Sequence, residues 1–326
     1  MKRVGMRAAA AIAALSVLGG CNGSLTADPA AYPEKDITFY VPYAPGGSTD
    51  PISRQFTKQL EKLLDANVTV ENRDGASATI GTSAVVEANP DGYTIGLSSN
   101  SALTYQPLVN SNLPYKTPQD YQPLIKLADL PTVLAVPADA PWKTFEDFMK
   151  AAKANPGKHR ISTSGALTAP DLSVKELSRT SGVNLKTVPF TGGGGEALTA
   201  LLGGKVEATA GYAATLRPQV ESGDVRVLAA FHEGTYEAFP EAQSIPEAGY
   251  DVTLPAAYYV IAPNDMPGKV LEKLTSAAKK AVSSPEFESF QDKNGYINEP
   301  ITGDAIRKEL QGYHKSYQEL NEFLGK

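Results

Sequence analysis

Cysteine and histidine are scarce in this chain of 326 residues, which contains one cysteine and three histidines. A single cysteine cannot form an intrachain disulfide, so the fold must be stabilised by burial of apolar side chains. His159, His232 and His314 stand far apart, and none has a metal-ligand spacing to the cysteine or to another histidine. We therefore expect no metal site built on these residues.

Motifs that mark common enzyme sites are also missing. The chain has no G-x-S-x-G nucleophile elbow, no G-x-x-x-x-G-K-[ST] phosphate loop and no G-x-G-x-x-G dinucleotide motif. The glycine run 192–195 lacks the last glycine of the dinucleotide motif. These absences predict a protein that is not an enzyme and that needs no cofactor.

Basic residues do not exceed acidic ones: 30 Lys and Arg face 36 Asp and Glu, and the formal net charge is -6. An acidic chain is not attracted to phosphate backbones, so we expect no nucleic-acid partner. Apolar residues make up 42% of the sequence, enough for a sizeable core. A mature chain of roughly 300 residues favours one large domain or two lobes.

Long hydrophobic runs are absent except near the start. Lys2, Arg3 and Arg7 precede the run 8–18, which is too short to span a bilayer but suits a signal peptide. The run ends in Leu18-Gly19-Gly20-Cys21, which matches a bacterial lipobox. We expect residues 1–20 to be a signal peptide, Cys21 to be lipidated and 21–31 to form a tether. The protein would then be extracytoplasmic and held on the bacterial cell membrane only by its lipid; the alternative is a plain secretory signal followed by an accidental cysteine.

Short β-like runs alternate with helical patterns along the chain, which predicts an α/β fold with mostly parallel sheets. The expected strands are 37–41, 68–71, 93–97, 132–136, 160–163, 185–188, 206–210, 225–231 and 258–262. A helix begins at Thr144, where Thr144 and Asp147 form a capping box. Further helices are expected at 170–181, after Gly195 through Leu198, Leu201 and Leu202, and at 267–283, 285–294 and 302–324.

A loop between an expected strand and an expected helix is the most informative segment. Its residues are Tyr43, Ala44, Pro45, Gly46, Gly47, Ser48, Thr49 and Asp50. The apolar spacing of Ile52, Phe56, Leu60 and Leu63 predicts a helix that Asp50 caps and whose first residue is Pro51. Glycines let the backbone approach a ligand, and a helix N-terminus offers free N–H donors, so the loop suits a carboxylate. The alternative is an ordinary βα turn.

Three more loops rich in small or hydroxyl residues follow expected strands. They are Ser98 to Ser101, which includes Asn100 and Ser101; Ser164 to Thr168; and Pro189 to Gly195. In parallel α/β sheets such loops lie together at the carboxyl ends of the strands, where ligands bind. Tyr93, Tyr105, Tyr212, Tyr258 and Tyr259 either line an aromatic pocket there or pack in the core.

Widely spaced motifs in the mature chain resemble a known family. They are Tyr32-Pro33 to Ile37, the loop 41–50 with Arg54, Val70-Glu71-Asn72-Arg73-Asp74-Gly75-Ala76, Asn89-Pro90-Asp91-Gly92-Tyr93-Thr94, Ala154-Asn155-Pro156-Gly157-Lys158, Val188-Pro189-Phe190-Thr191-Gly192, Leu201-Leu202-Gly203-Gly204-Lys205-Val206, Phe239-Pro240-Glu241, Glu247-Ala248-Gly249-Tyr250 and Ala262-Pro263. In this order they resemble the substrate-binding proteins of tripartite tricarboxylate transporters, the Bug family. The resemblance covers the chain from about Tyr32.

The resemblance implies a two-lobed periplasmic-binding-protein fold of type II, with a hinge and a ligand cleft between the lobes. It also implies a receptor that captures a small carboxylated solute and delivers it to membrane permease subunits. Tricarboxylates, dicarboxylates, acidic amino acids and aromatic acids all remain open. The ligand residues that it implies, together with those from the loops above, are Tyr43 to Asp50, Asn100, Ser101, Ser164, Ala166, Leu167, Thr168, Thr191, Gly192, Gly193 and Tyr212.

The chain departs from the family pattern at several positions. Leu167 stands where glycine is usual, Asp171 where histidine is usual, and Thr191 where lysine is usual. Gln243-Ser244 replaces a usual proline-threonine pair, and Ala257 falls near a common tryptophan. We expect lobe 1 to contain 32–130 and 255–326, lobe 2 to contain 131–254, and the protein to be a monomer. A secreted hydrolase or scavenging enzyme on the same fold is the alternative function.

Overall fold

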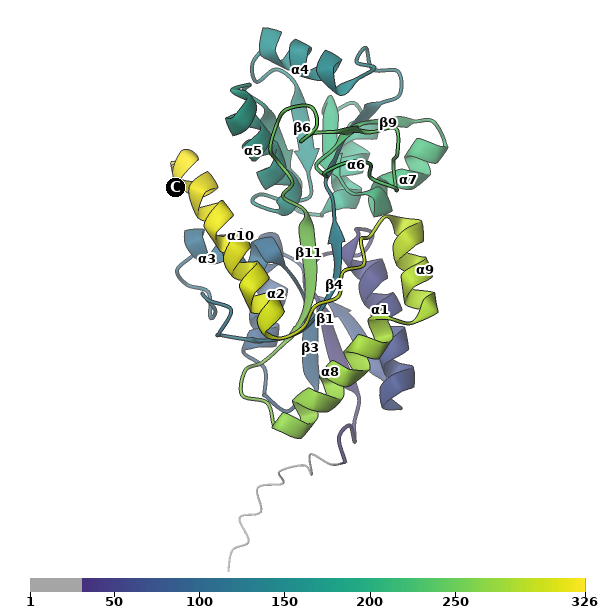
Figure 1. Ribbon diagram of the computed structural model, residues 1–326, viewed down its shortest axis with the longest axis vertical. Helices are drawn as coiled ribbons and strands as arrows, with labels where there is room; N and C mark the ends of the chain where they lie inside the picture. Colours follow the sequence, from purple (N-terminus) through teal and green to yellow (C-terminus); the bar gives the residue numbers. More distant parts are fainter. Residues whose placement is uncertain (1–30, 326) are drawn as a thin grey trace, which may run out of the picture.

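The computed structural model describes residues 31–325, so the predicted signal peptide, Cys21 and nearly all of the tether 21–31 lie outside the described residues. The described chain forms two lobes, each built around one β-sheet (Figure 1). Lobe 1 contains the two ends of the described chain, and lobe 2 is formed by its middle third. No helix in the part of the chain that the structure describes is long and apolar enough to cross a membrane.

The sheet of lobe 1 has five strands in the order β2-β1-β3-β11-β4. These are β1 (Ile37–Val41), β2 (Val68–Asn72), β3 (Thr94–Ser99), β4 (Gln122–Leu130) and β11 (Ala256–Ala262). Strands β2, β1 and β3 are parallel, whereas β11 runs antiparallel to both β3 and β4. The loops that follow β1 and β3 therefore lie at the same edge of the sheet.

The sheet of lobe 2 has six strands in the order β10-β9-β5-β8-β6-β7. These are β5 (Val133–Pro137), β6 (Arg160–Thr163), β7 (Lys186–Pro189), β8 (Ala208–Gly211), β9 (Val225–Ala230) and β10 (Gln243–Ser244). Strand β5 runs antiparallel to β8 and β9. Among the described strands, five of the nine pairings are parallel and only β5 and β11 run opposite to the others, so the prediction of mostly parallel sheets is confirmed. Both sheets are mixed, because β5 and β11 enter their sheets from the other lobe.

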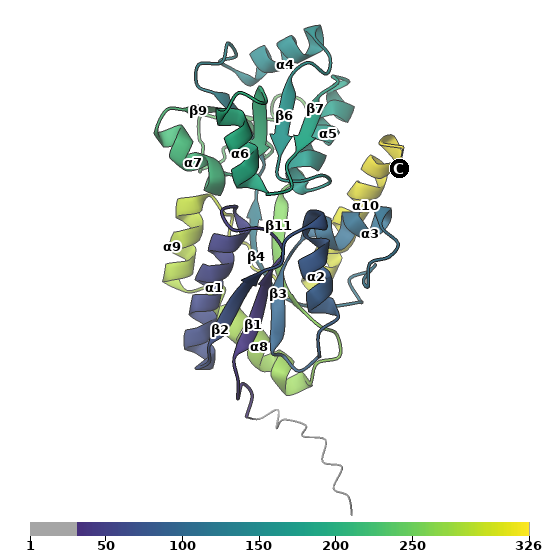
Figure 2. The same cartoon turned by 180° about the vertical axis from the view of Figure 1, so that it is seen from behind.

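Ten α-helices of the described chain cover the faces of the two sheets, as Figures 1 and 2 show from opposite sides. They are α1 (Thr49–Leu64), α2 (Thr79–Val86), α3 (Gln106–Val109), α4 (Phe145–Ala154), α5 (Ala169–Ser181), α6 (Gly194–Leu202), α7 (Ala213–Glu221), α8 (Gly268–Val282), α9 (Pro285–Asn294) and α10 (Asp304–Phe323). The predicted capping box at α4 is confirmed, because the Thr144 hydroxyl accepts from the Asp147 N–H and the Asp147 carboxylate accepts from the Thr144 N–H. Helix α9 has the predicted bounds.

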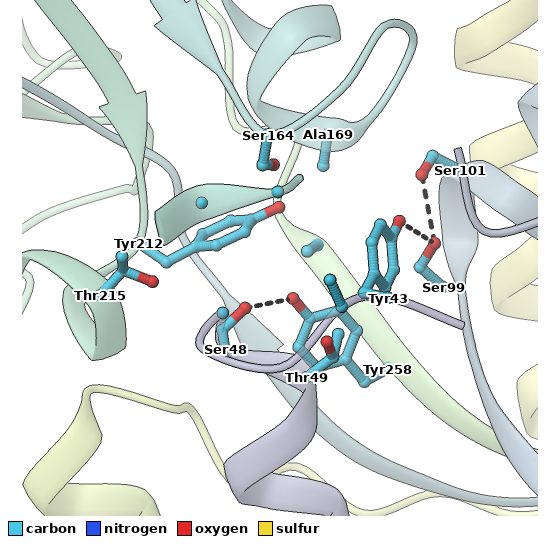
Figure 3. A pocket seen from close by; sticks show the side chains of 15 residues that line it. Tyr43, Ser48, Thr49, Ser99, Ser101, Ser164, Ala169, Tyr212, Thr215 and Tyr258 are labelled. Atoms are coloured by element: carbon cyan, nitrogen blue, oxygen red, sulfur yellow. Dashed lines mark hydrogen bonds between the residues drawn. The ribbon is translucent and has the colours of Figure 1, made fainter. Parts of the chain in front are cut away.

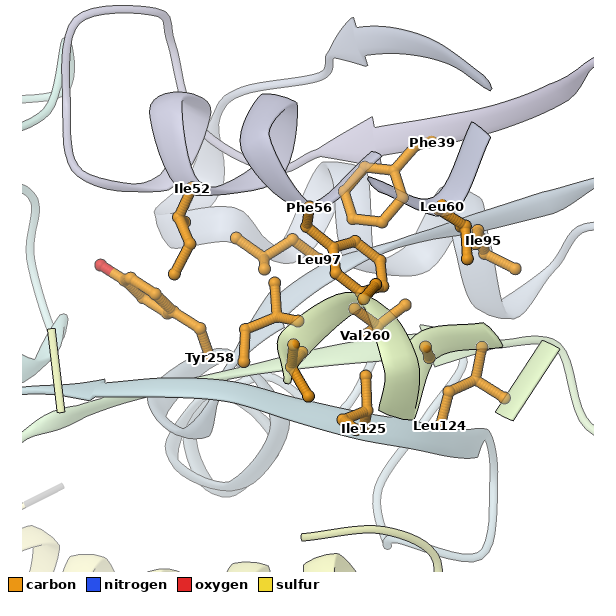
Figure 4. Close-up of a cluster of buried hydrophobic side chains, with 14 of the residues drawn as sticks. Phe39, Ile52, Phe56, Leu60, Ile95, Leu97, Leu124, Ile125, Tyr258 and Val260 are labelled. Carbon is orange, nitrogen blue, oxygen red and sulfur yellow. The ribbon is translucent and has the colours of Figure 1, made fainter. Parts of the chain in front are cut away.

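Helix α1 begins earlier than the sequence predicts. Its first residue is Thr49 and its N-cap is Ser48, so the prediction that Asp50 caps a helix starting at Pro51 is wrong. The predicted inward position of Leu63 is also wrong: Leu63 is 41% exposed, whereas Leu64 is buried. The buried apolar residues Ile52, Phe56, Leu60 and Leu64 follow one another in steps of four, so they lie on the face of α1 that packs against the sheet. Figure 4 shows Ile52, Phe56 and Leu60 against Phe39 and Val260 of the strands beneath.

In α6, too, one leucine of the predicted apolar face is exposed: Leu198 and Leu201 are buried, but Leu202 is 50% exposed. Strands β4 and β10 were not predicted. Strand β4 reads poorly because buried polar residues interrupt it: Lys126 is only 3% exposed in its side chain and forms ion pairs with Asp129 and Glu309. Strand β10 is too short for a sequence pattern.

The chain passes between the lobes twice. It leaves lobe 1 after Leu130, enters the second sheet at Val133, and returns between Ser244 and Ala256. Helix α10 belongs to the tail that follows β11, and its end packs where the lobes meet. Its Tyr317 and Leu320 share a buried cluster with Tyr105 of lobe 1 and Leu172 of lobe 2. These crossings and this cluster set how the lobes face each other.

Candidate functional site

A pocket lies where the two lobes meet (Figure 3). It is lined by Tyr43, Ala44, Gly47, Ser48, Thr49, Ser99, Ser101, Ser164, Ala169, Gly193, Gly194, Tyr212, Thr215, Ala256 and Tyr258. Its cavity volume is about 30 Å³. Since a cavity needs roughly 10–15 Å³ to hold one water, the closed pocket has room for about two waters. A solute of several carbon atoms therefore requires the lobes to move apart or side chains to rearrange.

Lobe 1 supplies the lower wall of the pocket. Tyr43, Ala44, Gly47 and Ser48 come from the β1–α1 loop and Thr49 from the start of α1. Ser99 ends β3, Ser101 lies in the short turn of helix that follows it, and Tyr258 belongs to β11. The Ser48 hydroxyl lies 2.8 Å from the Tyr258 hydroxyl. The Ser99 hydroxyl lies 3.2 Å from that of Ser101 and 3.5 Å from that of Tyr43. These hydrogen bonds, drawn in Figure 3, fix the side chains that present oxygen atoms to the cavity.

Lobe 2 supplies the upper wall from three segments that follow the parallel strands β6, β7 and β8. Ser164 and Ala169 come from the β6–α5 loop and the start of α5, Gly193 and Gly194 from the start of α6, and Tyr212 and Thr215 from the start of α7. Gly193 has φ of +82°, a conformation that glycine adopts with little strain. This lets the main chain turn into α6 at the pocket wall.

Helix N-termini converge on the pocket from both lobes. The N-cap residues of α1, α5, α6 and α7 are Ser48, Thr168, Gly193 and Tyr212, and none of them caps its helix with a side-chain hydrogen bond. The first N–H groups of a helix have no partner within the helix, and the N-terminus carries a partial positive charge. Such ends bind anions, so their convergence makes the pocket favourable for negative charge.

Charged side chains are missing from the described residues that line the pocket. Burial raises the pKa values of Tyr43, Tyr212 and Tyr258, so these phenols stay protonated at neutral pH. They can therefore donate hydrogen bonds to an anion. The polar groups of the described pocket lining are therefore neutral hydrogen-bond donors and helix N-termini, with no arginine or lysine among them.

Thr215 is the pocket residue that most directly indicates a ligand. Its Oγ1 is buried and has no hydrogen-bond partner in the described chain. A buried hydroxyl without a partner costs about 1–3 kcal/mol. Because this atom belongs to a side chain that lines the cavity, a bound solute would supply the missing partner.

The predicted ligand residues divide into two groups. Those that line the pocket are Tyr43, Ala44, Gly47, Ser48, Thr49, Ser101, Ser164, Gly193 and Tyr212. Those that do not are Pro45, Gly46, Asp50, Asn100, Ala166, Leu167, Thr168, Thr191 and Gly192. Whether the first group binds a solute stays a prediction.

Several residues of the second group support the walls of the pocket. Asp50 pairs with Arg54 at 2.9 Å and accepts a hydrogen bond from Asn72. Asn100 donates to the carbonyl of Pro255 and accepts from the N–H of Ala257, which holds the start of β11. The Thr168 hydroxyl donates to the Gly165 carbonyl at 2.9 Å.

The pocket also contains residues that were not among the predicted ligand residues: Ser99, Ala169, Gly194, Thr215, Ala256 and Tyr258. Ser99 belongs to a loop that the sequence singles out, and Tyr258 was a candidate for an aromatic wall. Thr215 lies outside the four loops that the sequence singles out, and only the folded structure places it, near the start of α7, in the pocket wall. Among residues 31–325 no cluster of His, Cys, Asp and Glu could hold a metal ion.

Comparison with known proteins gives consistent matches. The family model described as the tripartite tricarboxylate transporter family receptor matches residues 52–315. A Cupriavidus necator protein named "UPF0065 protein in gbd 5'region" is 32% identical over 311 residues, which is 91% of this chain and 92% of that protein.

Solved structures share the fold. The periplasmic binding protein BugD is 27% identical, with a TM-score of 0.83 over 90% of this chain and 99% of its own. The protein Rpa4515 of R. palustris, solved with adipate, is 22% identical, with a TM-score of 0.85 over 90% of this chain and 98% of its own. The two-lobed periplasmic-binding-protein fold implied by the sequence motifs is confirmed.

Proposed function

Since the chain belongs to the tripartite tricarboxylate transporter receptor family and shares its fold with the periplasmic binding protein BugD, we propose that it is an extracytoplasmic receptor that captures a small carboxylated organic solute and delivers it to a membrane permease. The solute binds in the pocket between the lobes. Adipate bound to a protein of the same fold is in keeping with a carboxylated ligand.

The observation that carries this proposal is the convergence of helix N-termini on an uncharged, hydroxyl-lined pocket. Helices α1, α5, α6 and α7 all begin at its wall. Main-chain N–H groups and helix ends stabilise a carboxylate without a charged partner. Because α1 comes from one lobe and the other helices from the second, a solute bound by both sets holds the lobes together.

Contacts across the cleft support closure around the solute. The Ser77 hydroxyl donates to the Ala166 carbonyl at 2.6 Å. A Cβ on Gly195 of lobe 2 would lie 3.4 Å from the Gly46 carbonyl oxygen of lobe 1. We place the boundaries of the lobes at 32–130 with 255–326 and at 131–254, so that both crossings act as the hinge.

The remaining parts of the proposal concern location and partners. Cys21 carries a lipid that anchors the receptor, and the segment 21–31 tethers it near the permease. The receptor acts as a monomer, since one chain contains both lobes and the whole pocket. It requires no cofactor for binding.

A hydrolase is the alternative function. Ser48, Ser99, Ser101 and Ser164 line the pocket, but no histidine, lysine or carboxylate stands beside them among its described lining residues. A serine nucleophile needs such a base. A turnover assay on carboxylate esters tests this alternative, and we expect no hydrolysis above that of buffer.

A thermal-shift screen tests the proposed function. Citrate, malate, adipate, glutamate and phthalate are added in turn to the full chain. A ligand that binds only the folded state at a concentration one hundred times its Kd stabilises it by about 2.7 kcal/mol. We expect one class of carboxylates to raise Tm, to reduce the radius of gyration in small-angle scattering, and to bind equally well in the presence of a chelator. No response to any carboxylate would contradict the proposal.

A further inference from the structure

The turn that follows α9 contacts lobe 2 and the binding loop through adjacent residues. The Tyr236 hydroxyl of lobe 2 donates a hydrogen bond to the Gly295 carbonyl. The hydroxyl of the next residue, Tyr296, donates to the Ser48 carbonyl at the start of α1. Helix α9 itself packs on α1 and also contacts α7 of lobe 2, as its position in Figures 1 and 2 shows. The turn therefore contacts lobe 2 on one side and the binding loop of lobe 1 on the other.

Gly295 lets the two lobes approach each other closely because it has no Cβ. A Cβ at this position would lie 2.6 Å from the Ala213 Cβ, 2.7 Å from the Ala238 Cβ and 2.7 Å from the Tyr236 hydroxyl oxygen. All three neighbours belong to lobe 2, and Ala213 directly follows the pocket residue Tyr212. Real Cβ atoms do not approach this closely, so a side chain at 295 would push lobe 2 away.

Tyr296 holds the binding loop in place. Its side chain is buried, at 4% exposure, and its ring stacks on Phe290 with centroids 5.9 Å apart. The Ser48 residue that it contacts is also held through its hydroxyl by Tyr258. The main chain and the side chain of Ser48 are therefore fixed by different tyrosines, which orients the N-terminus of α1 toward the cavity.

We propose that the Gly295–Tyr296 turn couples closure of the lobes to the geometry of the binding loop. Lobe 2 packs against Gly295 when the cleft closes. Because Tyr296 is the next residue and its hydroxyl binds the Ser48 carbonyl, a shift of this contact moves the start of α1. Both act as positioning residues rather than ligand contacts, since neither lines the pocket. The link to solute binding rests on the proposed function, whereas the coupling itself is testable without a solute.

The first experiment measures closure in the ligand-free full chain. Spin labels are attached to Lys58→Cys and Lys153→Cys, exposed positions in different lobes, with Cys21→Ser removing the native thiol. We expect Gly295→Ala to lower the population at the short interlobe distance at least threefold. The matched control is Gly182→Ala, since Gly182 also follows a helix with positive φ (+64° against +72°) but has nothing within 4 Å of a Cβ.

The control separates backbone strain from the interlobe contact. Both substitutions place alanine in the left-handed region, and only the one at 295 meets the other lobe. If Gly295→Ala and Gly182→Ala leave the distance distribution equally unchanged, Gly295 does not govern closure and the proposal fails.

The second experiment measures the binding loop by hydrogen exchange of the amides of 46–50. Tyr296→Phe removes the hydroxyl that reaches Ser48, and we expect these amides to exchange at least threefold faster. Tyr105→Phe is the control, because its buried hydroxyl donates to Asn321, away from the loop. Equal exchange in the parent and in Tyr296→Phe would overturn the role of Tyr296.

Neither measurement uses a solute, so the outcomes are separable from the carboxylate screen. A screen without any response contradicts the proposed function and leaves the coupling to be judged by the distances and exchange rates. A positive screen with unchanged distances and exchange overturns the coupling alone.

Discussion

The hydroxyl of Ser48 lies 2.8 Å from the hydroxyl of Tyr258, 210 residues away along the chain. Ser48 is the N-cap residue of α1, although its side chain makes no capping hydrogen bond, and Tyr258 belongs to β11, the strand that returns from lobe 2. This hydrogen bond joins the binding loop to the strand that leads back from the hinge. It also places both oxygens at the pocket wall.

Tyr258→Phe should destabilise the ligand-free protein. The substitution leaves the buried Ser48 hydroxyl without its partner, which costs about 1–3 kcal/mol. The double variant Ser48→Ala with Tyr258→Phe removes both polar groups and should recover much of that loss. Urea unfolding of the four proteins measures the coupling. Additive effects of the two substitutions would show that the hydrogen bond contributes nothing.

Gly47→Val should abolish detectable carboxylate binding while the fold is kept. Gly47 lines the pocket and a Cβ there meets nothing within 4 Å, so the added side chain extends into space that the solute needs. Gly268→Val is the control, since Gly268 is also a glycine with no atom near its Cβ but begins α8. Calorimetric titration with the best carboxylate from the screen, alongside circular dichroism, measures both. Parent-like binding by Gly47→Val would show that this loop is only a turn.

Thr215→Val should weaken binding without weakening the fold. The variant removes a buried oxygen that has no partner, so the stability of the ligand-free protein should stay the same or rise. Loss of its hydrogen bond to the solute should cost about 0.5–1.5 kcal/mol of binding free energy. Thr168→Val is the contrasting control. Its hydroxyl bonds to Gly165 and does not line the pocket, so stability should fall and affinity should change little. The opposite pattern would assign the ligand hydroxyl to Thr168.

Acid should remove the stabilising contribution of Asp50. Burial favours its neutral form, but hydrogen bonds from Arg54 and Asn72 and the Arg54 charge outweigh burial and lower the pKa of Asp50 below its usual value of 3.8. A lowered folded-state pKa stabilises the protein above the unfolded-state pKa, and this contribution is lost as pH falls through the folded-state pKa. The difference in Tm between the parent and Asp50→Asn should therefore be largest near neutral pH and shrink below about pH 4. A difference that does not vary between pH 7 and pH 3 would contradict this.

Cys21→Ala should release the protein from the membrane fraction. The prediction rests on Leu18-Gly19-Gly20-Cys21 following a basic and then an apolar segment. Since the lipid is the proposed anchor, its loss leaves the lobes unattached. Cell fractionation with a high-salt wash measures the distribution. Retention of the variant in the washed membranes would show that Cys21 is not the anchor.

Local patterns in the sequence predicted much of the fold. The apolar alternation of 37–41 and the capping box at Thr144 depend only on neighbouring residues, and both elements form as expected. Strand β4 was missed because its buried Lys126 is paired with Glu309 of α10, a partner 183 residues away. A lysine in an apolar run indicates an exposed loop and not a buried strand, unless the carboxylate that pairs with it is known.

The sequence by itself determined the α/β class, most element positions and the loops that reach the pocket, because these follow from short-range periodicity, glycine and helix-cap chemistry. The tertiary structure decided which members of those loops face the cavity. It brought Asn72 of β2 against Asp50, turned Asn100 toward β11, and placed Thr215 in the wall. Those outcomes depend on contacts between segments that are distant in the sequence, and such contacts cannot be read from the spacing of residues within one segment.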